Sequence, residues 1–344
     1  VLAIKQTLYR VSSSSPVVQA LEKAVQNGKQ VTVLMEVKAR FDEANNILMA
    51  RRLEKAGAHV IYGLVGLKTH SKCTLVIRRE KDGIRRYVHV ATGNYNASTA
   101  KLYTDLGILT CNDRFGIDAS AFFNLLSGYS DPPIWDSFIV APINLRQRCI
   151  ELIDREIHFA KNGEDAHMIA KMNSLLDKGI IEKLYEASQA GVKIELIVRG
   201  ICVLIPGIPG ISDNITVRSI VGRFLEHSRI FWFRNGGREE LYISSADWMP
   251  RNLNDRVELM VPIEDPEIKR RLKQMVDIEL SDNQKAHIMQ ADGTWLKTIS
   301  AENQLCAQEY FQKIAEKRDA EDEMTLAQKL EPYTPVLGHG DGSD

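Results

Sequence analysis

Residues 66–77 read GLKTHSKCTLVI, and this stretch sets the pattern for the rest of the chain. His70 and Lys72 stand two positions apart where an apolar strand begins, so both side chains can point to one face of that strand. The arrangement returns in residues 225–233, which read LEHSRIFWF and contain His227 and Arg229. Two such His-x-Lys/Arg pairs, each entering a strand, predict one active site shared between two related halves.

The segments around each pair alternate between strands and helices. Strands are predicted from short apolar runs, at residues 31–37, 59–62, 72–79, 85–91, 105–112, 167–171 and 192–198. Helices are predicted between and beyond them, at residues 16–27, 41–56, 118–126, 145–161, 177–190, 266–280 and 300–320. Because this alternation is typical of α/β proteins, we predict an α/β fold with mixed sheets flanked by helices.

The length and composition of the chain fit about two globular domains. The 344 residues are 44% hydrophobic and 26% charged, a balance typical of globular proteins. Residues 127–133, with Gly128 and the Pro132-Pro133 pair, have the composition of a linker. We therefore predict a first catalytic domain at residues 1–137, a second at residues 138–325 and a disordered tail at residues 326–344.

Charge and cysteine content argue against several classes of protein. The net charge of −1 gives no overall basic field, so we do not expect a nucleic-acid binder. The five cysteines have no Cys-x-x-Cys spacing, which indicates reduced thiols in a cytoplasmic protein rather than disulfides or a zinc site. No run approaches the roughly 20 apolar residues that a membrane span needs. The chain begins at Val1 rather than at methionine, so we expect it to be part of a longer protein.

The paired histidines suit phosphoryl transfer. A neutral imidazole can attack phosphorus, and a nearby cation such as Lys72 stabilises the equatorial oxygens of the transition state. A second histidine on the far side can protonate or stabilise the leaving oxygen. A single histidine at the mouth of a strand is more often a solvated or hydrogen-bonded residue. Two histidines in matched contexts favour the catalytic interpretation of His70 and His227.

Three arginines follow predicted strands: Arg10, Arg40 and Arg199. Residues just past the carboxyl ends of parallel strands line the ligand crevice of an α/β sheet, and a guanidinium group there can bind phosphate through two donors. Each arginine alone could equally cap a strand or form a salt bridge. Three of them beside two histidines favour a polyanionic ligand. The sequence has no P-loop motif, so nucleotide binding of that kind is not indicated.

Duplicated His-x-Lys halves with small polar loops resemble the phospholipase D superfamily. The sequence departs from that pattern, because Val76-Ile77 stand where the superfamily has an aspartate and Arg229 replaces the second lysine. The chain more closely resembles polyphosphate kinases of the bacterial type built on two phospholipase D-like domains. The segments that carry this resemblance are Lys5–Arg10, Glu36–Asp42, Lys68–Lys72, Ala91–Asn96, Tyr103–Gly107, Val198–Cys202 and Glu226–Arg229.

The resemblance implies a role for each candidate residue. It makes His70 the residue that is phosphorylated during turnover and His227 the second catalytic histidine. Asp105 is expected to orient His70 through a hydrogen bond. The remaining residues are expected to bind substrate: Arg10 and Arg40 hold phosphate and magnesium-linked oxygens, Lys72 stabilises phosphate, and Tyr103, Arg199 and His227 contact ATP.

The sequence therefore predicts reversible transfer of the ATP γ-phosphate to inorganic polyphosphate through a phosphohistidine, with Mg²⁺ neutralising the triphosphate. ATP, ADP and polyphosphate are the expected substrates. A homo-oligomer with peripheral contact to the inner membrane is also compatible with the resemblance. Two alternatives stay open: a phospholipase D-like phosphodiesterase or nuclease, and a polyanion-binding fragment without turnover. The resemblance also implies upstream domains, without which this chain could be inactive.

Overall fold

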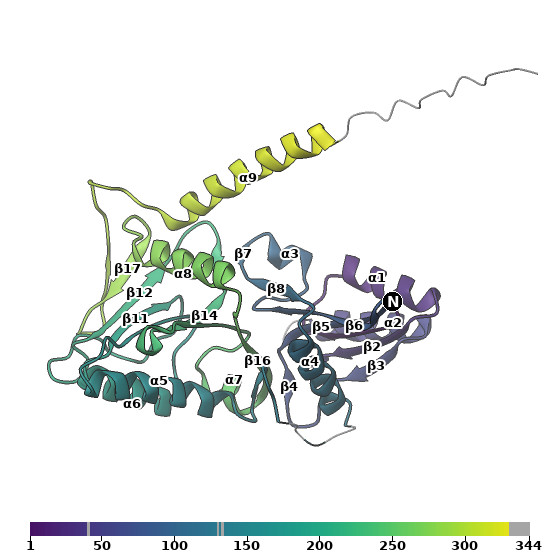
Figure 1. Cartoon of the computed structure of the whole chain (residues 1–344), viewed down its shortest axis with the longest axis horizontal. Coiled ribbons are helices and arrows are strands. Elements are labelled where there is room, and N and C mark those ends of the chain that lie inside the picture. The colour runs from purple at the N-terminus through teal and green to yellow at the C-terminus, as the bar shows by residue number, and fades with distance from the viewer. Residues whose placement is uncertain (40–41, 129–130, 132–133, 330–344) are drawn as a thin grey trace, which may run out of the picture.

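Two β-sheets with helices on their faces organise the chain in the computed structural model (Figure 1). The structure describes residues 1–39, 42–128, 131 and 134–329. The predicted α/β fold with mixed sheets flanked by helices is confirmed.

The first sheet forms within the first half of the chain. Its strands β1, β2 and β3 are parallel, whereas β5, β6 and β8 are antiparallel to their neighbours. In order across the sheet, the six strands are β3 (His59–Tyr62), β2 (Gln30–Met35), β1 (Ala3–Leu8), β5 (Lys72–Glu80), β6 (Gly83–Ala91) and β8 (Gly107–Thr110).

The second sheet repeats this arrangement and extends it. β10 and β11 are parallel like β1 and β2, and β14 runs antiparallel beside β10 as β5 does beside β1. Its strands are β18 (Trp295–Lys297), β17 (Ala286–Met289), β12 (Ile215–Ile220), β11 (Lys193–Val198), β10 (His167–Met172), β14 (Arg229–Phe233), β15 (Glu240–Ser244), β16 (Arg256–Pro262) and β4 (Lys68–Thr69), with β9 (Ile139–Ala141) also paired to β16.

Helix boundaries follow from local capping chemistry. α1 begins with Pro16 after Ser15, whose hydroxyl accepts a hydrogen bond from the amide of Val18. Asp177 and Asp265 cap two further helices in the same way. The helices are α1 (Pro16–Gln26), α2 (Glu43–Ala56), α3 (Ala97–Ala100), α4 (Asp113–Leu126), α5 (Leu145–Lys161), α6 (Lys178–Gln189), α7 (Pro250–Asn254), α8 (Pro266–Leu280) and α9 (Ala307–Lys329), with a 3₁₀ turn at Asn235–Gly237.

One hydrophobic core joins the two halves. Phe122 of α4 packs in a buried cluster with Leu75 and Val88 of the first sheet and with Trp232 and Leu259 of the second. α8 covers the same face of the second sheet, while α5 and α6 cover its other face (Figure 1). The two halves therefore share apolar packing instead of meeting only through a linker.

Two short ladders also connect the halves. β4 pairs in parallel with β16, so that Thr69 lies opposite Val257. β7 (Tyr103–Thr104) pairs in parallel with β13 (Leu225–Glu226) as a separate two-stranded sheet. Each ladder ends beside one of the paired histidines, so chain segments from both halves position each histidine.

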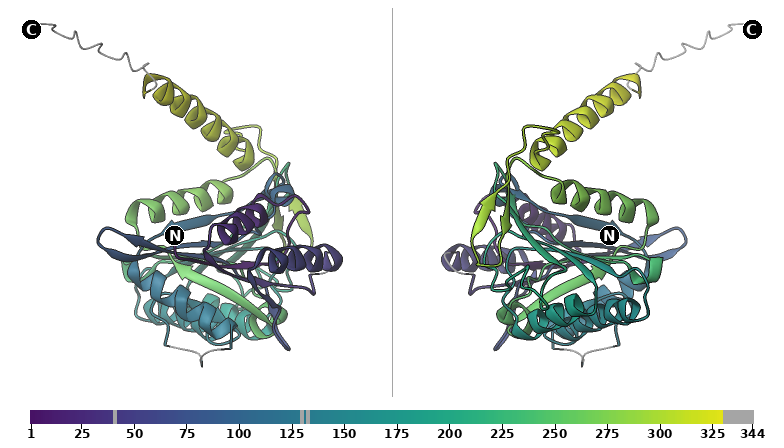
Figure 2. Two further views of the ribbon diagram at one scale, coloured as in Figure 1. Left: turned by 90° about the vertical axis from the view of Figure 1, so that its right-hand side faces the viewer. Right: turned by 90° about the vertical axis from the view of Figure 1, so that its left-hand side faces the viewer.

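The structure differs from the sequence prediction mainly near the C-terminus. Strands β17 and β18 were not predicted, and α9 begins at Ala307 instead of residue 300. α9 continues to Lys329 and so occupies residues 326–329 of the predicted tail; residues 330–344 lie outside the described residues. Figure 2 shows α9 extending away from the sheets. The domain division at residue 137 stays a prediction, and β4 of the first half belongs to the second sheet.

Candidate active site

His70 and His227 both lie where the two halves meet. His70 follows β4, and its amide donates to the carbonyl of Val257 in β16 at 3.0 Å. His227 follows β13, and its amide donates to the carbonyl of Thr104 in β7 at 3.2 Å. Each histidine is therefore held by backbone hydrogen bonds to the opposite half of the chain.

Each imidazole also contacts a carboxylate from the opposite half. His70 Nδ1 lies 2.9 Å from both carboxylate oxygens of Glu258, and His227 Nδ1 lies 2.7 Å from Asp105 Oδ1. The prediction that Asp105 hydrogen-bonds His70 is wrong. The two ladders explain the exchange, because Asp105 follows β7, which pairs with the strand before His227, whereas Glu258 lies in β16, which pairs with the strand before His70.

The small polar loops that follow β6 and β15 hold these carboxylates in place. Thr92 Oγ1 donates to Asp105 Oδ1 at 2.6 Å, and Ser245 Oγ donates to Glu258 Oε2 at 2.5 Å. Asn252 Nδ2 of α7 donates to Glu258 Oε1 at 2.6 Å. Glu258 is completely buried. Equivalent loops in the two halves thus orient the carboxylates that contact the two histidines.

The surroundings of His70 keep its imidazole neutral, and no hydrogen bond from the described part of the chain reaches its Nε2. Burial raises the pKa of Glu258, while the charge of Lys72 and the hydrogen bond from Ser245 oppose this shift and favour the carboxylate. As a carboxylate, Glu258 can only accept hydrogen bonds, so the proton of neutral His70 sits on Nδ1 and the lone pair on Nε2. Burial is the main cause that lowers the pKa of His70 well below its ordinary value, with the charges of Lys72 and Arg256 adding to it. A neutral imidazole with a free Nε2 can act as a nucleophile.

The pKa of His227 is also lowered, but here the neighbouring carboxylate opposes the shift. Burial lowers its pKa first and the charge of Arg229 second, while the hydrogen bond to Asp105 raises it. Burial opposes ionisation of Asp105, but hydrogen bonds from His227 and Thr92 bring the pKa of its carboxyl below the usual range. Asp105 therefore stays a carboxylate and orients the His227 ring.

The two basic residues of the paired motifs differ in their partners. Arg229 binds Asp247 through Nε at 3.1 Å and Nη2 at 3.3 Å, and its Nη1 donates to the carbonyl of His227 at 2.6 Å. Lys72 is buried, and its Nζ donates to the carbonyl of His70. Burial lowers the pKa of Lys72 to about 7, although Glu258 opposes this shift. Charges from each motif lower the pKa of the other histidine, so both histidines share one cationic environment.

Arg10 and Tyr103, two of the predicted substrate-binding residues, lie on the two sides of the site. On the His70 side, Arg10 Nε lies 2.9 Å from Asp42 Oδ2, and the guanidinium is 5.7 Å from the ring of Tyr9, which packs edge-on against His70 at 4.8 Å. On the other side, the ring of Tyr103 lies 4.9 Å from that of His227.

Arg199 completes the set of predicted phosphate ligands that the structure describes. Its Nε donates to Asn173 Oδ1 at 2.9 Å, and burial lowers the pKa of its guanidinium. The amide of Asn173 donates to Asp247, the partner of Arg229. Arg40 lies outside the described residues.

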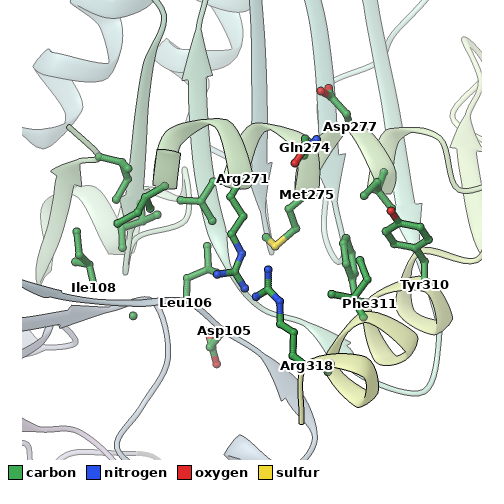
Figure 3. Close-up of a pocket in the computed structure, with 18 of the residues that line it drawn as sticks. Asp105, Leu106, Ile108, Arg271, Gln274, Met275, Asp277, Tyr310, Phe311 and Arg318 are labelled. Carbon is green, nitrogen blue, oxygen red and sulfur yellow. The ribbon is translucent and has the colours of Figure 1, made fainter. Parts of the chain in front are cut away.

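An open pocket of about 1110 Å³ adjoins Asp105. It lies between β8, α8 and α9, and its largely apolar lining includes Met275 and Phe311. Figure 3 shows Arg271 of α8 and Arg318 of α9 pointing toward each other beside Leu106. The carboxylate that orients His227 therefore lies at the edge of an accessible pocket.

Sequence reasoning missed several residues of the site. Glu258 binds His70, Asp247 binds Arg229, and Tyr9 packs on His70. Asn252 acts one step further away, because it donates to Glu258. The order of elements carried a signal for Glu258. In both halves a hairpin, a small polar loop and a short helix precede an acidic residue, which directly follows β7 in the first half and lies in β16 in the second. The role of Asp247 could not be predicted in this way, because only the fold shows that it pairs with Arg229.

Family models match almost the whole chain. The model described as "Polyphosphate kinase C-terminal domain 1" matches residues 1–132, and that described as "Polyphosphate kinase C-terminal domain 2" matches residues 138–308.

Curated relatives and a solved structure agree with these matches. A polyphosphate kinase of Halalkalibacterium halodurans is 61% identical over 83% of this chain and 41% of its own length. One of Synechocystis sp. is 56% identical over 92% of this chain and 44% of its own length. The crystal structure of polyphosphate kinase from Porphyromonas gingivalis aligns with a TM-score of 0.85 at 38% identity, covering 93% of this chain and 49% of the other. The chain thus spans less than half the length of the curated relatives it matches.

Proposed function

Since the chain belongs to the polyphosphate kinase family, we propose that it is the catalytic region for reversible transfer of the ATP γ-phosphoryl group to inorganic polyphosphate. The observation that carries this proposal is the neutral His70. Its Nδ1 hydrogen-bonds Glu258, and its Nε2 keeps its lone pair. A second histidine held by its own carboxylate and a set of cations around both rings support the same chemistry.

The proposed reaction has two steps. In the first, His70 Nε2 forms a bond to the γ-phosphorus of ATP while the bond from that phosphorus to the bridging oxygen breaks, so that ADP leaves with the electron pair. In the second, a terminal oxygen of polyphosphate attacks the same phosphorus, and the N–P bond returns its electrons to His70. The reverse sequence makes ATP from ADP.

The surrounding residues stabilise the charge that this transfer redistributes. His227, oriented by Asp105, is placed to stabilise the leaving or attacking oxygen. Lys72 and Arg229 supply positive charge beside the two rings, and Arg10, Arg40, Tyr103 and Arg199 are the proposed contacts to phosphate and nucleotide. Positioning and electrostatic stabilisation account for most of the catalysis in phosphoryl transfer.

Magnesium is proposed to arrive with the substrate. Within the described part of the chain, no group of three or more His, Cys, Asp or Glu side chains could hold a metal ion. Mg²⁺ commonly binds through substrate phosphates and its own waters. We therefore assign it to the triphosphate of ATP, with Arg10 and Arg40 contacting magnesium-linked phosphate oxygens.

Assembly and location are proposals from family membership alone. We propose a homo-oligomer in the cytoplasm that contacts the inner membrane peripherally. None of the helices in the described ranges is both long and apolar enough to cross a bilayer. Light scattering of the purified protein and its fractionation between membrane and supernatant test these two points.

Labelling with γ-³²P-ATP tests the proposed function. The unmodified chain and an unmodified full-length relative should both acquire acid-labile label that chases into polyphosphate. The substitutions below are made in the chain and at the corresponding positions of the relative. His70→Ala should abolish this label. His158→Ala should retain it, because His158 is an exposed residue near the end of α5 whose ring contacts Asn162 and Phe159. Label that persists in His70→Ala would overturn the assignment.

The same experiment separates the alternatives. A phospholipase D-like phosphodiesterase would release products from a phosphodiester substrate and take no label from ATP. A binding fragment without turnover would retain polyphosphate after His70→Ala but never become labelled.

A further inference from the structure

A buried cluster of charged and polar side chains surrounds Glu226, the residue that precedes His227. Lys171 comes from β10, Glu226 from β13, Glu279 from α8 and Gln308 from α9. The exposed fraction of each of these residues is 6% or less. Burying an ion pair of this kind brings little net stability, because the desolvation of both charges offsets their attraction. A contribution to the stability of the fold therefore does not explain why these charges are buried here.

Glu226 is the centre of this cluster. Its Oε2 accepts from Lys171 Nζ at 2.7 Å and from Thr104 Oγ1 at 2.9 Å, while its Oε1 accepts from Gln308 Nε2 at 2.7 Å. Lys171 also binds Glu279 on its other side. The carboxylate of Glu226 thus receives donors from three separate elements, one of which belongs to the opposite half of the chain.

The position of these contacts links them to the active site. Glu226 and Thr104 are opposite each other in the β13–β7 ladder. The next residue after Glu226 is His227, and the next residue after Thr104 is Asp105. Any shift between Glu226 and Thr104 therefore changes the 2.7 Å contact between the imidazole and the carboxylate that follow them.

We propose that Glu226 is a positioning residue that fixes the register of β13 on β7 and thereby the hydrogen bond from His227 to Asp105. Lys171 and Gln308 hold Glu226 from the sheet and from the start of α9. The inference rests on the proposed function for its catalytic consequence, since it concerns the second histidine of that site. A misplacement of about 1 Å at a reacting group can cost roughly 10²-fold in rate.

Glu226→Gln is the most direct variant. Glutamine has nearly the same shape, but its amide has one acceptor oxygen and one NH₂ donor. The carboxylate of Glu226 meets donors at both oxygens, so the NH₂ group must face either Lys171 and Thr104 or Gln308. The variant therefore breaks the contacts that hold the ladder while leaving the volume of the core unchanged.

Glu279→Gln is the matched control. Glu279 binds the same Lys171 in the same buried cluster and also hydrogen-bonds Glu226, but among the described residues it makes no hydrogen bond to β7. A glutamine at this position keeps a donor toward Glu226. Burial is the main cause that raises the pKa of Glu279 to about 7, so this variant replaces a group that is already partly neutral near that pH. Both variants should change the melting temperature to a similar extent.

The measurement is the ¹⁵N NMR spectrum of histidine rings in the 344-residue chain, with His227 assigned from the spectrum of His227→Ala. In the unmodified chain and in Glu279→Gln, neutral His227 should carry its proton on Nδ1, because Asp105 accepts it. In Glu226→Gln the two neutral tautomers should mix, and kcat should fall by roughly 10- to 100-fold. An unchanged tautomer in a folded Glu226→Gln chain would overturn the proposal.

Thr104→Val keeps the proposal testable if Glu226→Gln does not fold. It removes the hydroxyl that reaches Glu226 from β7 and leaves Lys171 and Glu279 untouched. It should mix the tautomers of His227 in the same way, and an unchanged tautomer would again contradict the proposal. The NMR result does not depend on turnover. If neither the unmodified chain nor the unmodified full-length relative takes label from ATP, the proposed function fails, while the tautomers still decide whether Glu226 positions His227.

Discussion

At the scale of single residues, each histidine of the proposed active site contacts a carboxylate from the other half. Glu258 orients His70 and Asp105 orients His227. The pairing determines which nitrogen carries the proton, and with it which nitrogen can react. The chemistry of the site is therefore set by residues that lie 188 and 122 positions away from the histidines they serve.

Glu258→Gln should greatly reduce phosphorylation of His70. An amide NH₂ in place of one carboxylate oxygen favours the wrong tautomer, and a comparable change in another catalytic triad costs roughly 10⁴-fold. We expect a loss of at least about 100-fold in the rate of labelling from ATP. Glu156→Gln is the matched control, because Glu156 is also buried and accepts only backbone amides of Asn235 and His167. Equal losses in both variants would mean that the effect is general destabilisation.

The pH dependence of kcat/KM should reflect His70 on the acid side and Lys72 on the alkaline side. Because the pKa of His70 is lowered, its neutral form persists below pH 6.5 and the rate should stay level there. Because the pKa of Lys72 is lowered to about 7, the rate should decline above that pH as the ammonium loses its proton. Lys72→Arg keeps the charge and should remove the alkaline decline. The same decline in Lys72→Arg would exclude Lys72 as its source.

At the scale of elements, the loop between β6 and α3 places Asp105. A Cβ added at Gly93 would lie 2.1 Å from Asp105 Oδ2, a separation that no real contact tolerates. Gly93→Ala should therefore push Asp105 away from His227 and reduce turnover by roughly 10- to 100-fold. Gly116→Ala in α4 creates a milder clash, with the added Cβ 2.8 Å from Cβ of Arg86, and should lower stability while leaving turnover nearly unchanged. Turnover that falls equally in both variants would contradict a specific role for the loop.

Most long elements could be predicted from the sequence, and the two-residue strands could not. The predicted helices at residues 145–161 and 266–280 match α5 and α8, because apolar periodicity and capping residues mark both ends. β4, β7 and β13 have two residues each, too few for any periodicity. Their pairing also joins segments more than 100 positions apart, which local sequence does not encode.

The same limit explains what was and was not predicted at the site. Two His-x-Lys/Arg pairs can be recognised locally, so sequence reasoning found His70 and His227. The partner of each histidine depends on the short ladders, and sequence reasoning assigned Asp105 to the wrong ring for that reason. The roles of Arg10, Tyr103 and Arg199 stay predictions, and Arg40 lies outside the described residues.

At the scale of the whole molecule, the shared core should make the two halves unfold together. Phe122 is fully buried between the sheets, and Phe122→Ala should cost about 3–5 kcal/mol. Hydrogen exchange should show β1 in the first half and β10 in the second losing protection by the same amount. Leu48→Ala, at a largely exposed position of α2, should leave both nearly unchanged. Loss of protection confined to one half would show that the halves unfold separately.

The attachment site of phosphate on His70 tests the account most directly. Glu258 takes up Nδ1 of His70, so only Nε2 can attack the γ-phosphate of ATP. ³¹P and ¹⁵N NMR of the phosphorylated protein distinguishes the two isomers of phosphohistidine. We predict phosphate on Nε2 of His70; phosphate on Nδ1, or on another residue with His70 intact, would contradict the account.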